Sequence, residues 1–152
     1  MNLPLCVDLD GTLIHTDMLH ETALGLVRDR PLAVLSIPAW LARGKAVLKQ
    51  LIAERVQMDV AALPYNESLL AWLRTQRANG RRLILCTASD TRLAAAIAAH
   101  LGIFDDVMAS DGQTNLSGTC KADALVRRFG EKGFDYAGSA ESDLAVWRRA
   151  RR

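Results

Sequence analysis

Apolar and polar residues change their spacing several times along the chain, and these changes separate strands from helices. Short, nearly continuous apolar runs are typical of strands that are buried on both faces. Such runs occur at 3–7, 82–86, 106–109 and 134–138, and amphipathic stretches lie between them. Strands that alternate with helices predict an α/β fold with a parallel, doubly wound sheet.

The amphipathic stretches after residue 63 have the periodicity and the end signals of helices. We expect helices at 67–78, 90–100 and 121–129, and a last helix from 141 to the end of the chain. Gly102 and Gly130 follow two of them at the position where helices commonly end. In parallel sheets, ligands bind beyond the carboxyl ends of the strands, which are followed here by Asp8, Thr87 and Ser139.

Residues 16–63 have a different pattern, with helical spacing and no strand signal. Thr16 or Asp17 can cap a helix that runs to about residue 29, and a helix is expected at 45–56. The apolar segment 31–42 between them contains Pro38 and is too short to span a bilayer, which needs about 20 residues. We therefore predict a helical insertion, 16–63, in a core formed by 1–15 and 64–152.

Composition limits the class of protein. The chain has 152 residues, of which 50% are hydrophobic and 24% charged, as in ordinary globular domains. Its formal net charge of +2 gives no support for nucleic-acid binding. The three cysteines, Cys6, Cys86 and Cys120, lack metal-ligand spacing, and no N-terminal signal sequence is apparent. Together these features favour a reducing, cytoplasmic setting.

Two carboxylates stand directly after the first apolar run, in the sequence Val7-Asp8-Leu9-Asp10-Gly11-Thr12. Their spacing of two places both side chains on the same side of an extended chain. Acids this close repel each other and need a cation or a shared proton if they are buried. An acidic turn at a strand end is the alternative interpretation, because Asp and Gly are common in turns.

The stretch DLDGT resembles the first motif of the haloacid dehalogenase (HAD) superfamily of phosphohydrolases. The resemblance implies a Rossmann-like, HAD-like fold in which Asp8 is the nucleophile and Asp10 the general acid/base. It also implies that Thr87, the backbone of Ala88 and Lys121 hold the phosphoryl group. Lys121 is the first residue of the predicted helix 121–129, after the stretch that begins at Ser117. A cation at a helix start is unfavourable unless an anion lies nearby. A helix cap near Thr87 and a surface lysine at 121 are the alternatives.

The fourth motif of the family has two acids that hold Mg²⁺, and here the match is partial. Asp143 aligns with the second acid, whereas Ser139 occupies the position of the first. The resemblance implies that Asp8, the Asp10 carbonyl and Asp143 hold Mg²⁺, a cation that prefers oxygen ligands. Glu141 and Asp143 also suit the first turn of a helix, which is the alternative.

The insertion 16–63 lies where members of the family carry a cap over the active site. Residues in or beside it that could contact substrate, or could simply face solvent, are His15, His20, Arg28, Arg43 and Lys45. The sequence thus predicts a Mg²⁺-dependent phosphatase that acts on a small phosphorylated metabolite. The alternative, which Ser139 favours, is a weakly active or inactive phosphate-binding or regulatory domain.

Two further stretches, Thr-Asp-Met-Leu-His-Glu at 16–21 and Tyr-Ala-Gly-x-x-x-x-Asp-Leu-Ala-Val-Trp at 136–147, are similar to HAD domains fused to UbiA-type membrane prenyltransferases. That resemblance implies a membrane-protein domain C-terminal to this chain and a location at the cytoplasmic face of a membrane. The basic end, 148–152, could then lie near the membrane. Its alternative role is that of a solvated helix end.

Overall fold

The computed structural model describes residues 3–152, and a parallel sheet of four strands forms its centre. The strands are β1 (Leu5–Val7), β2 (Leu83–Asp90), β3 (Asp106–Ser110) and β4 (Asp135–Ala137), in the order β3-β2-β1-β4. β1 pairs in parallel with both β2 and β4, so the first strand of the chain lies inside the sheet. This arrangement confirms the predicted α/β fold class.

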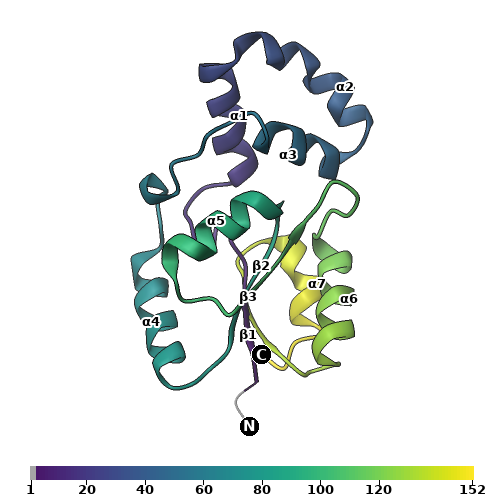
Figure 1. Ribbon diagram of the computed structural model, residues 1–152. Helices are drawn as coiled ribbons and strands as arrows, with labels where there is room; N and C mark the ends of the chain where they lie inside the picture. The colour runs from purple at the N-terminus through teal and green to yellow at the C-terminus, as the bar shows by residue number, and fades with distance from the viewer. Residues whose placement is uncertain (1–2) are drawn as a thin grey trace.

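Helices cover both faces of the sheet, as a doubly wound fold requires. Figure 1 shows α4 (Glu67–Ala78) and α5 (Thr91–Leu101) on one side of the strands. On the other side lie α6 (Gly118–Phe129) and α7 (Leu144–Trp147). Each face therefore has its own apolar core.

The alternation of side chains along β1 supplies both cores. Leu5 and Val7 belong to the cluster that includes Leu73 of α4, and Cys6 belongs to the cluster that includes Leu125 of α6. All of these residues are buried. A strand covered on both faces cannot carry solvated side chains, which explains why its sequence is apolar throughout.

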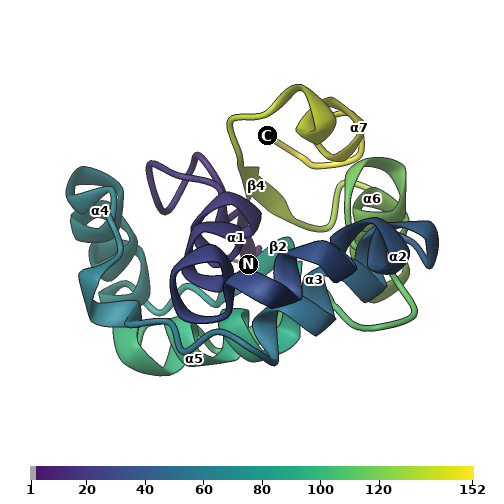
Figure 2. The same cartoon turned by 90° about the horizontal axis from the view of Figure 1, so that it is seen from above.

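The segment predicted as an insertion forms a helical lobe, which we define as residues 18–53. It contains α1 (Met18–Asp29), the 3-10 helix η1 (Pro31–Ser36), α2 (Ile37–Ala42) and α3 (Lys45–Ala53). In Figures 1 and 2 the lobe lies above the carboxyl ends of the strands, with α1 and α3 over the sheet and α2 over α6.

A small core of its own stabilises the lobe. Leu26 of α1 packs with Leu48 and Ile52 of α3, and Val56 completes the cluster. The Asp17 carboxylate accepts hydrogen bonds from the first backbone N–H groups of α1, so Asp17 rather than Thr16 is the N-cap. Local capping and a few long-range apolar contacts thus define the lobe.

The two chain segments that join the lobe to the core lie side by side. Ile14 and Tyr65 form an antiparallel bridge, and the His15 N–H donates to the Pro64 carbonyl over 2.9 Å. A second short helix, η2 (Val60–Ala62), precedes this pairing. The chain therefore leaves and re-enters the core at neighbouring points, close to the boundaries predicted at 15 and 64, although those boundaries remain a prediction.

Two elements differ from the sequence prediction. β2 continues through Thr87 to Asp90, with an irregularity in its pairing with β3 between Cys86 and Asp90. The last helix does not run to the end of the chain, because α7 stops at Trp147. Beyond it, the Arg151 N–H donates to the Phe134 carbonyl over 2.8 Å, so hydrogen bonds to the sheet edge replace those of the predicted helix.

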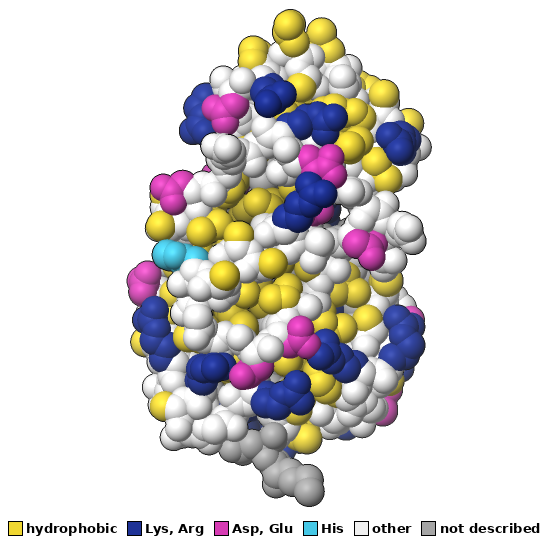
Figure 3. Space-filling view, viewed as in Figure 1, with side chains coloured by type: hydrophobic (Ala, Val, Ile, Leu, Met, Phe, Trp, Pro, Cys, Tyr) yellow, Lys and Arg dark blue, Asp and Glu magenta, His cyan; other side chains and the backbone are white. Residues whose placement is uncertain are grey.

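Figure 3 shows hydrophobic side chains gathered at the top of the lobe. They include Leu32 and Leu35 of η1, whose exposed fractions are 82% and 80%. No helix within residues 3–152 is both long and apolar enough to cross a membrane.

Candidate active site

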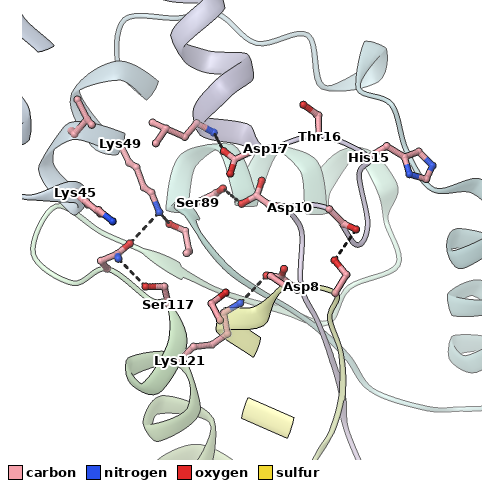
Figure 4. A pocket seen from close by; sticks show the side chains of 18 of the residues that line it. Asp8, Asp10, His15, Thr16, Asp17, Lys45, Lys49, Ser89, Ser117 and Lys121 are labelled. Carbon is pink, nitrogen blue, oxygen red and sulfur yellow. Dashed lines mark hydrogen bonds and ion pairs between the residues drawn. The ribbon is translucent and has the colours of Figure 1, made fainter. Parts of the chain in front are cut away.

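A cavity of about 620 Å³ lies between the helical lobe and the carboxyl ends of the strands (Figure 4). The side chains that give it charge come from both sides: Asp8, Asp10 and Lys121 from the core, and Asp17, Lys45 and Lys49 from the lobe and its entrance. The fold thus places its charged groups where ligands bind in parallel α/β sheets.

Asp8 stands at the base of this cavity, directly after β1. Its backbone N–H donates to the Ala137 carbonyl over 2.8 Å, which holds it to β4. Its carboxylate is buried, and Oδ1 accepts a hydrogen bond from Lys121 Nζ over 2.7 Å. Burial raises the pKa of Asp8 to about 6, although the Lys121 ammonium opposes the shift. Asp8 is therefore ionised at neutral pH and paired with a cation.

Lys121 lies in the first turn of α6 and is the centre of a buried network. Its ammonium donates to Asp8, to the Tyr136 hydroxyl over 2.9 Å and to Asp143 Oδ1 over 3.4 Å. Burial is the largest single influence and disfavours the charge on Lys121, but the attraction of Asp8, Cys86 and Asp143 together outweighs it, and the pKa of the lysine is raised. Three oxygens therefore hold the ammonium in one position.

The oxygens of Asp143 are engaged by donors of the chain. Oδ1 accepts from the Tyr136 hydroxyl over 2.7 Å and from Lys121. Oδ2 accepts from the backbone N–H groups of Ser139 and Ala140, both over 3.1 Å. Asp143 thus orders the loop after β4 and supports Lys121.

Ser139 closes the loop against the turn that follows Asp8. Its hydroxyl donates to the Gly11 carbonyl over 2.8 Å and lies 2.9 Å from the Thr12 hydroxyl. Gly11 has a φ of +69°, and a Cβ at this position would lie 3.2 Å from Ser139 Oγ. Glycine is needed here both for the left-handed backbone and for the close approach of the loop.

The Asp10 carboxylate has hydrogen-bond partners different from those of the Asp8 carboxylate. Its Oδ1 accepts from the Met18 N–H over 2.7 Å, and its Oδ2 accepts from the Ser89 hydroxyl over 2.9 Å. Burial raises the pKa of Asp10, although these two hydrogen bonds oppose the shift. The helix cap expected near Thr87 is Asp90, and the contact of Ser89 with Asp10 was not expected from the sequence.

Thr87 and Ala88 lie near the end of β2, and of these two only Ala88 lines the cavity. Thr87 is fully buried, and its hydroxyl accepts from the Ser89 N–H over 3.0 Å. Ala88 and Ser89 line the cavity. The Ala88 carbonyl accepts from Lys49 Nζ and from the Ser110 hydroxyl, both over 2.7 Å. Thr87 thus shapes the turn, and its neighbours face the cavity.

The residues proposed from the sequence for substrate contact separate into two groups. His15 and Lys45 line the cavity. His20 and Arg28 line other surface hollows, and Arg43 is exposed. Lys49 also lines the cavity, but it was not among the residues expected from the sequence. Its position on a helix does not indicate which core residues its side chain reaches.

Comparison with known proteins agrees with this geometry. The family model of the haloacid dehalogenase-like hydrolases matches residues 5–145. The chain belongs to this family. It is 41% identical over 149 residues to an uncharacterised protein of Sinorhizobium fredii, and it spans 28% of the length of that relative.

Solved structures of the HAD family share the fold at low sequence identity. A HAD family hydrolase from Salmonella enterica serovar Typhi superposes with a TM-score of 0.67 at 15% identity, over 97% of this chain and 61% of that one. A substrate-bound phosphoserine phosphatase also gives 0.67, at 13% identity, over 99% of this chain and 83% of that chain. The helical lobe is included in both superpositions, because they cover nearly the whole chain.

The metal centre that the resemblance implies, formed by Asp8, the Asp10 carbonyl and Asp143, stays a prediction. Within residues 3–152, no three Asp, Glu, His or Cys side chains are grouped so that they could hold a metal ion. The Asp10 carboxylate is bound to Met18 and Ser89, and the Asp143 carboxylate to four donors of the chain. Asp143 does not line the cavity, whereas Asp8 does, and Mg²⁺ usually keeps several waters beside one or two carboxylates, so Asp8 and the Asp10 carbonyl are the groups that would hold the ion.

Proposed function

We propose that this chain hydrolyses monophosphate esters of small molecules through an aspartyl-phosphate on Asp8. One observation carries the proposal: a buried carboxylate, ion-paired with Lys121 over 2.7 Å, faces a cavity at the carboxyl ends of the strands. Membership in the HAD-like hydrolase family supports a hydrolytic reaction. The phosphatase-like fold of the solved relatives agrees with it.

The first step forms a bond between an Asp8 carboxylate oxygen and phosphorus, while the bond from phosphorus to the ester oxygen breaks. Lys121 orders the nucleophile by binding its Oδ1 and supplies positive charge near the transferring group. Among residues 3–152 no donor is hydrogen-bonded to Asp8 Oδ2, which makes this oxygen the attacking atom. Positioning and charge neutralisation are the main requirements of phosphoryl transfer.

Asp10 transfers the proton in both halves of the reaction. Its raised pKa suits a group that gives a proton to the leaving oxygen in the first step. In the second step the Asp10 carboxylate takes a proton from water, which attacks phosphorus, releases inorganic phosphate and frees Asp8. The Ser89 hydroxyl, bound to Asp10 Oδ2, fixes the orientation of this group.

Release of phosphate from a generic aryl phosphate tests the proposal. The native chain should release phosphate, and Asp8→Asn should release none while its circular dichroism remains native. Acid-stable, hydroxylamine-sensitive labelling of the native chain by radioactive substrate would support the acyl-phosphate. Unchanged hydrolysis by Asp8→Asn would exclude Asp8 as the nucleophile.

A second candidate function is phosphate binding with little or no turnover. Ser139 stands where the family has an acid, and its hydroxyl is bound to Gly11 and Thr12. Dependence on Mg²⁺ is therefore a separate question, which Ser139→Asp addresses. If the native site lacks a metal ligand, the variant should bind Mg²⁺ more tightly by calorimetry and gain tenfold or more in rate, about 1.4 kcal/mol.

Docking to a membrane partner remains a prediction based on the UbiA-type resemblance and on the exposed Leu32 and Leu35. Cytoplasmic location likewise remains a prediction. The relative from Sinorhizobium fredii is several times longer than this chain, so that protein has room for further domains. The chain should float with liposomes, and Leu32→Ser with Leu35→Ser should weaken flotation if the lobe contributes. Equal flotation of both proteins would exclude this contribution.

A further inference from the structure

Two lysines of the helical lobe face the cavity from the side opposite Asp8. Lys45 and Lys49 stand one turn apart on α3 and both line the cavity (Figure 4). Lys49 Nζ donates to the Ala88 carbonyl over 2.7 Å and to Asn115 Oδ1 over 3.1 Å. An ammonium has three N–H donors, so one donor of Lys49 remains for a ligand.

The charges around these lysines are unbalanced. Neither amine has an ion-pair partner within 4 Å in the part of the chain that the structure describes. Lys45 is the first residue of α3, where the helix dipole is positive and a cation is unfavourable. Like charges one turn apart on a helix also repel each other. An anion at this end of the cavity would relieve both effects.

Asp10 and Asp17 do not remove this imbalance. Both favour the charged form of Lys49 at a distance, whereas Lys45, Lys121 and above all burial lower its pKa. The oxygens of Asp10 are bound by Met18 and Ser89, and Asp17 caps α1. Lys121 is itself paired with Asp8. The cavity thus has two cationic ends, of which only the core end is paired with a carboxylate.

We propose that Lys45 and Lys49 form a second anion-binding site, which holds a carboxylate or a second phosphate at the end of the substrate away from the transferred phosphoryl group. This proposal rests on the phosphatase function proposed above. The transferred group would lie at Asp8 and Lys121, and the second anion would lie at the lobe. The substrate class is therefore phosphate esters of small acids or bisphosphates.

Matched pairs of substrates test the second site. We suggest phosphonooxyalkanoates of two to four carbons, each compared with its methyl ester, which keeps the phosphate but lacks the carboxylate charge. For the native chain, the ratio of kcat/KM for acid over ester should be tenfold or more for at least one chain length. Lys45→Met and Lys49→Met should each reduce that ratio toward one. Arg30→Met, an exposed cation of the lobe, is the control and should keep the ratio.

A binding measurement separates failure of this proposal from failure of the proposed function. Asp8→Asn protein should bind the acid more tightly than the ester by calorimetry, and a second change, Lys45→Met, should remove the difference. This outcome would support the anion site even if the chain hydrolyses nothing. Equal affinity for acid and ester, or no binding of either, would overturn the proposal, and so would hydrolysis of both at equal rates.

Loss of folding does not explain the expected result. In Lys49→Met the Ala88 carbonyl keeps its hydrogen bond from the Ser110 hydroxyl, so no buried acceptor is left unpaired. Lys45 is exposed and donates no hydrogen bond within residues 3–152, which makes Lys45→Met the safer variant. A native thermal transition is required of each variant before kinetics are compared.

Discussion

At the scale of single residues, the site depends on how buried charges are paired. Lys121 contacts Asp8, Tyr136 and Asp143, and all four side chains are buried. Breaking such a network is harmful because it leaves a charge without a partner in a medium of low polarity. The pKa of Asp8 is raised, so the folded protein favours the protonated form of this side chain more than the unfolded chain does.

We predict that Asp8→Asn abolishes turnover and removes a pH dependence of stability between about pH 4 and pH 6. Folding raises the Asp8 pKa from 3.8 to about 6, so the folded state binds this proton more tightly than the unfolded chain. The contribution of Asp8 to the free energy of unfolding therefore falls as the pH rises from about 4 to about 6. Between pH 4 and pH 7 the free energy of unfolding of the variant, measured by urea denaturation, should rise relative to that of the native chain by about 1 to 3 kcal/mol.

A difference in stability between the variant and the native chain that stays the same from pH 4 to pH 7 would contradict this prediction. Asp111→Asn is the matched control, because Asp111 is exposed and its pKa is lowered by hydrogen bonds from the backbone of Thr114 and Gln113. The free energy of unfolding of this control should be equal to or lower than that of the native chain at pH 7. Its difference from the native chain should change with pH in the opposite direction.

Tyr136→Phe tests whether the position of Lys121 matters for catalysis. The change removes the hydroxyl that lies between Lys121 and Asp143 Oδ1 but keeps the ring against Trp147. We expect the free energy of unfolding to fall by about 1 to 2 kcal/mol, because a buried charged acceptor loses a donor. The measured kcat should fall while KM changes little, and an unchanged kcat would show that Lys121 is positioned without Tyr136.

At the scale of elements, the end of the chain is held by the sheet rather than by helix formation. Arg151 and Arg152 both reach the Asp135 carboxylate of β4, as does the buried Arg81. Arg149 pairs with Asp123 and Glu131. Three of the four arginines of the basic end therefore pair with acids of the core, although Arg151 and Arg152 remain exposed to solvent.

We predict that Asp135→Ala destabilises the protein strongly. Burial opposes the charge of Asp135, but hydrogen bonds from Arg151 and Arg81 hold its pKa below the usual range. Removing the carboxylate leaves the buried Arg81 without its partner, which should lower the free energy of unfolding by about 3 to 5 kcal/mol. Thermal denaturation measures the effect.

Arg152→Ala is the matched comparison for Asp135→Ala, because the Arg152 side chain is 77% exposed. It should change stability by less than about 1 kcal/mol, as surface ion pairs do. Equal effects of the two substitutions would show that burial of the charge is not the reason for the stability of this region.

At the scale of the whole molecule, the chain passes from the core to the lobe and back at one place. Residues 13–15 and 64–66 pair with each other, and the apolar cluster of β1, α4 and α5 lies on the core side of this pairing. The lobe provides the roof of the cavity through Leu41, Leu48 and the two lysines of α3. Because both connecting segments meet at this pairing, a short linker can bridge them in place of the lobe.

We predict that the core folds without the lobe. Replacing residues 18–62 by a short Gly-Ser linker should give a protein with native-like circular dichroism and a cooperative transition of reduced midpoint. Its hydrolysis of aryl phosphate should fall at least tenfold, since the roof that excludes water is lost. A chain without a cooperative transition would show that the lobe is required for the core, and the predicted boundaries would then be wrong.

Several features of the fold and the site could be predicted because the signals are local. The apolar run at 3–7, the acids Asp8 and Asp10 and the glycines after helices each act within a few residues. Strand type, helix ends and the meeting of motifs at one sheet edge follow from such signals. Lys121 could be singled out for the same reason, since a cation at a helix start indicates a nearby anion.

The sequence by itself thus determined the parallel α/β core, the inserted helices and the residues that gather at the carboxyl ends of the strands. Only the tertiary structure decided how Asp10 and Asp143 are bound, that Lys49 reaches Ala88, and that the chain end leaves its helix for β4. These outcomes depend on hydrogen-bond partners that are distant along the chain, such as Lys49 and Ala88. A buried polar group takes whichever partner the packing brings within reach, and local periodicity carries no information about that partner.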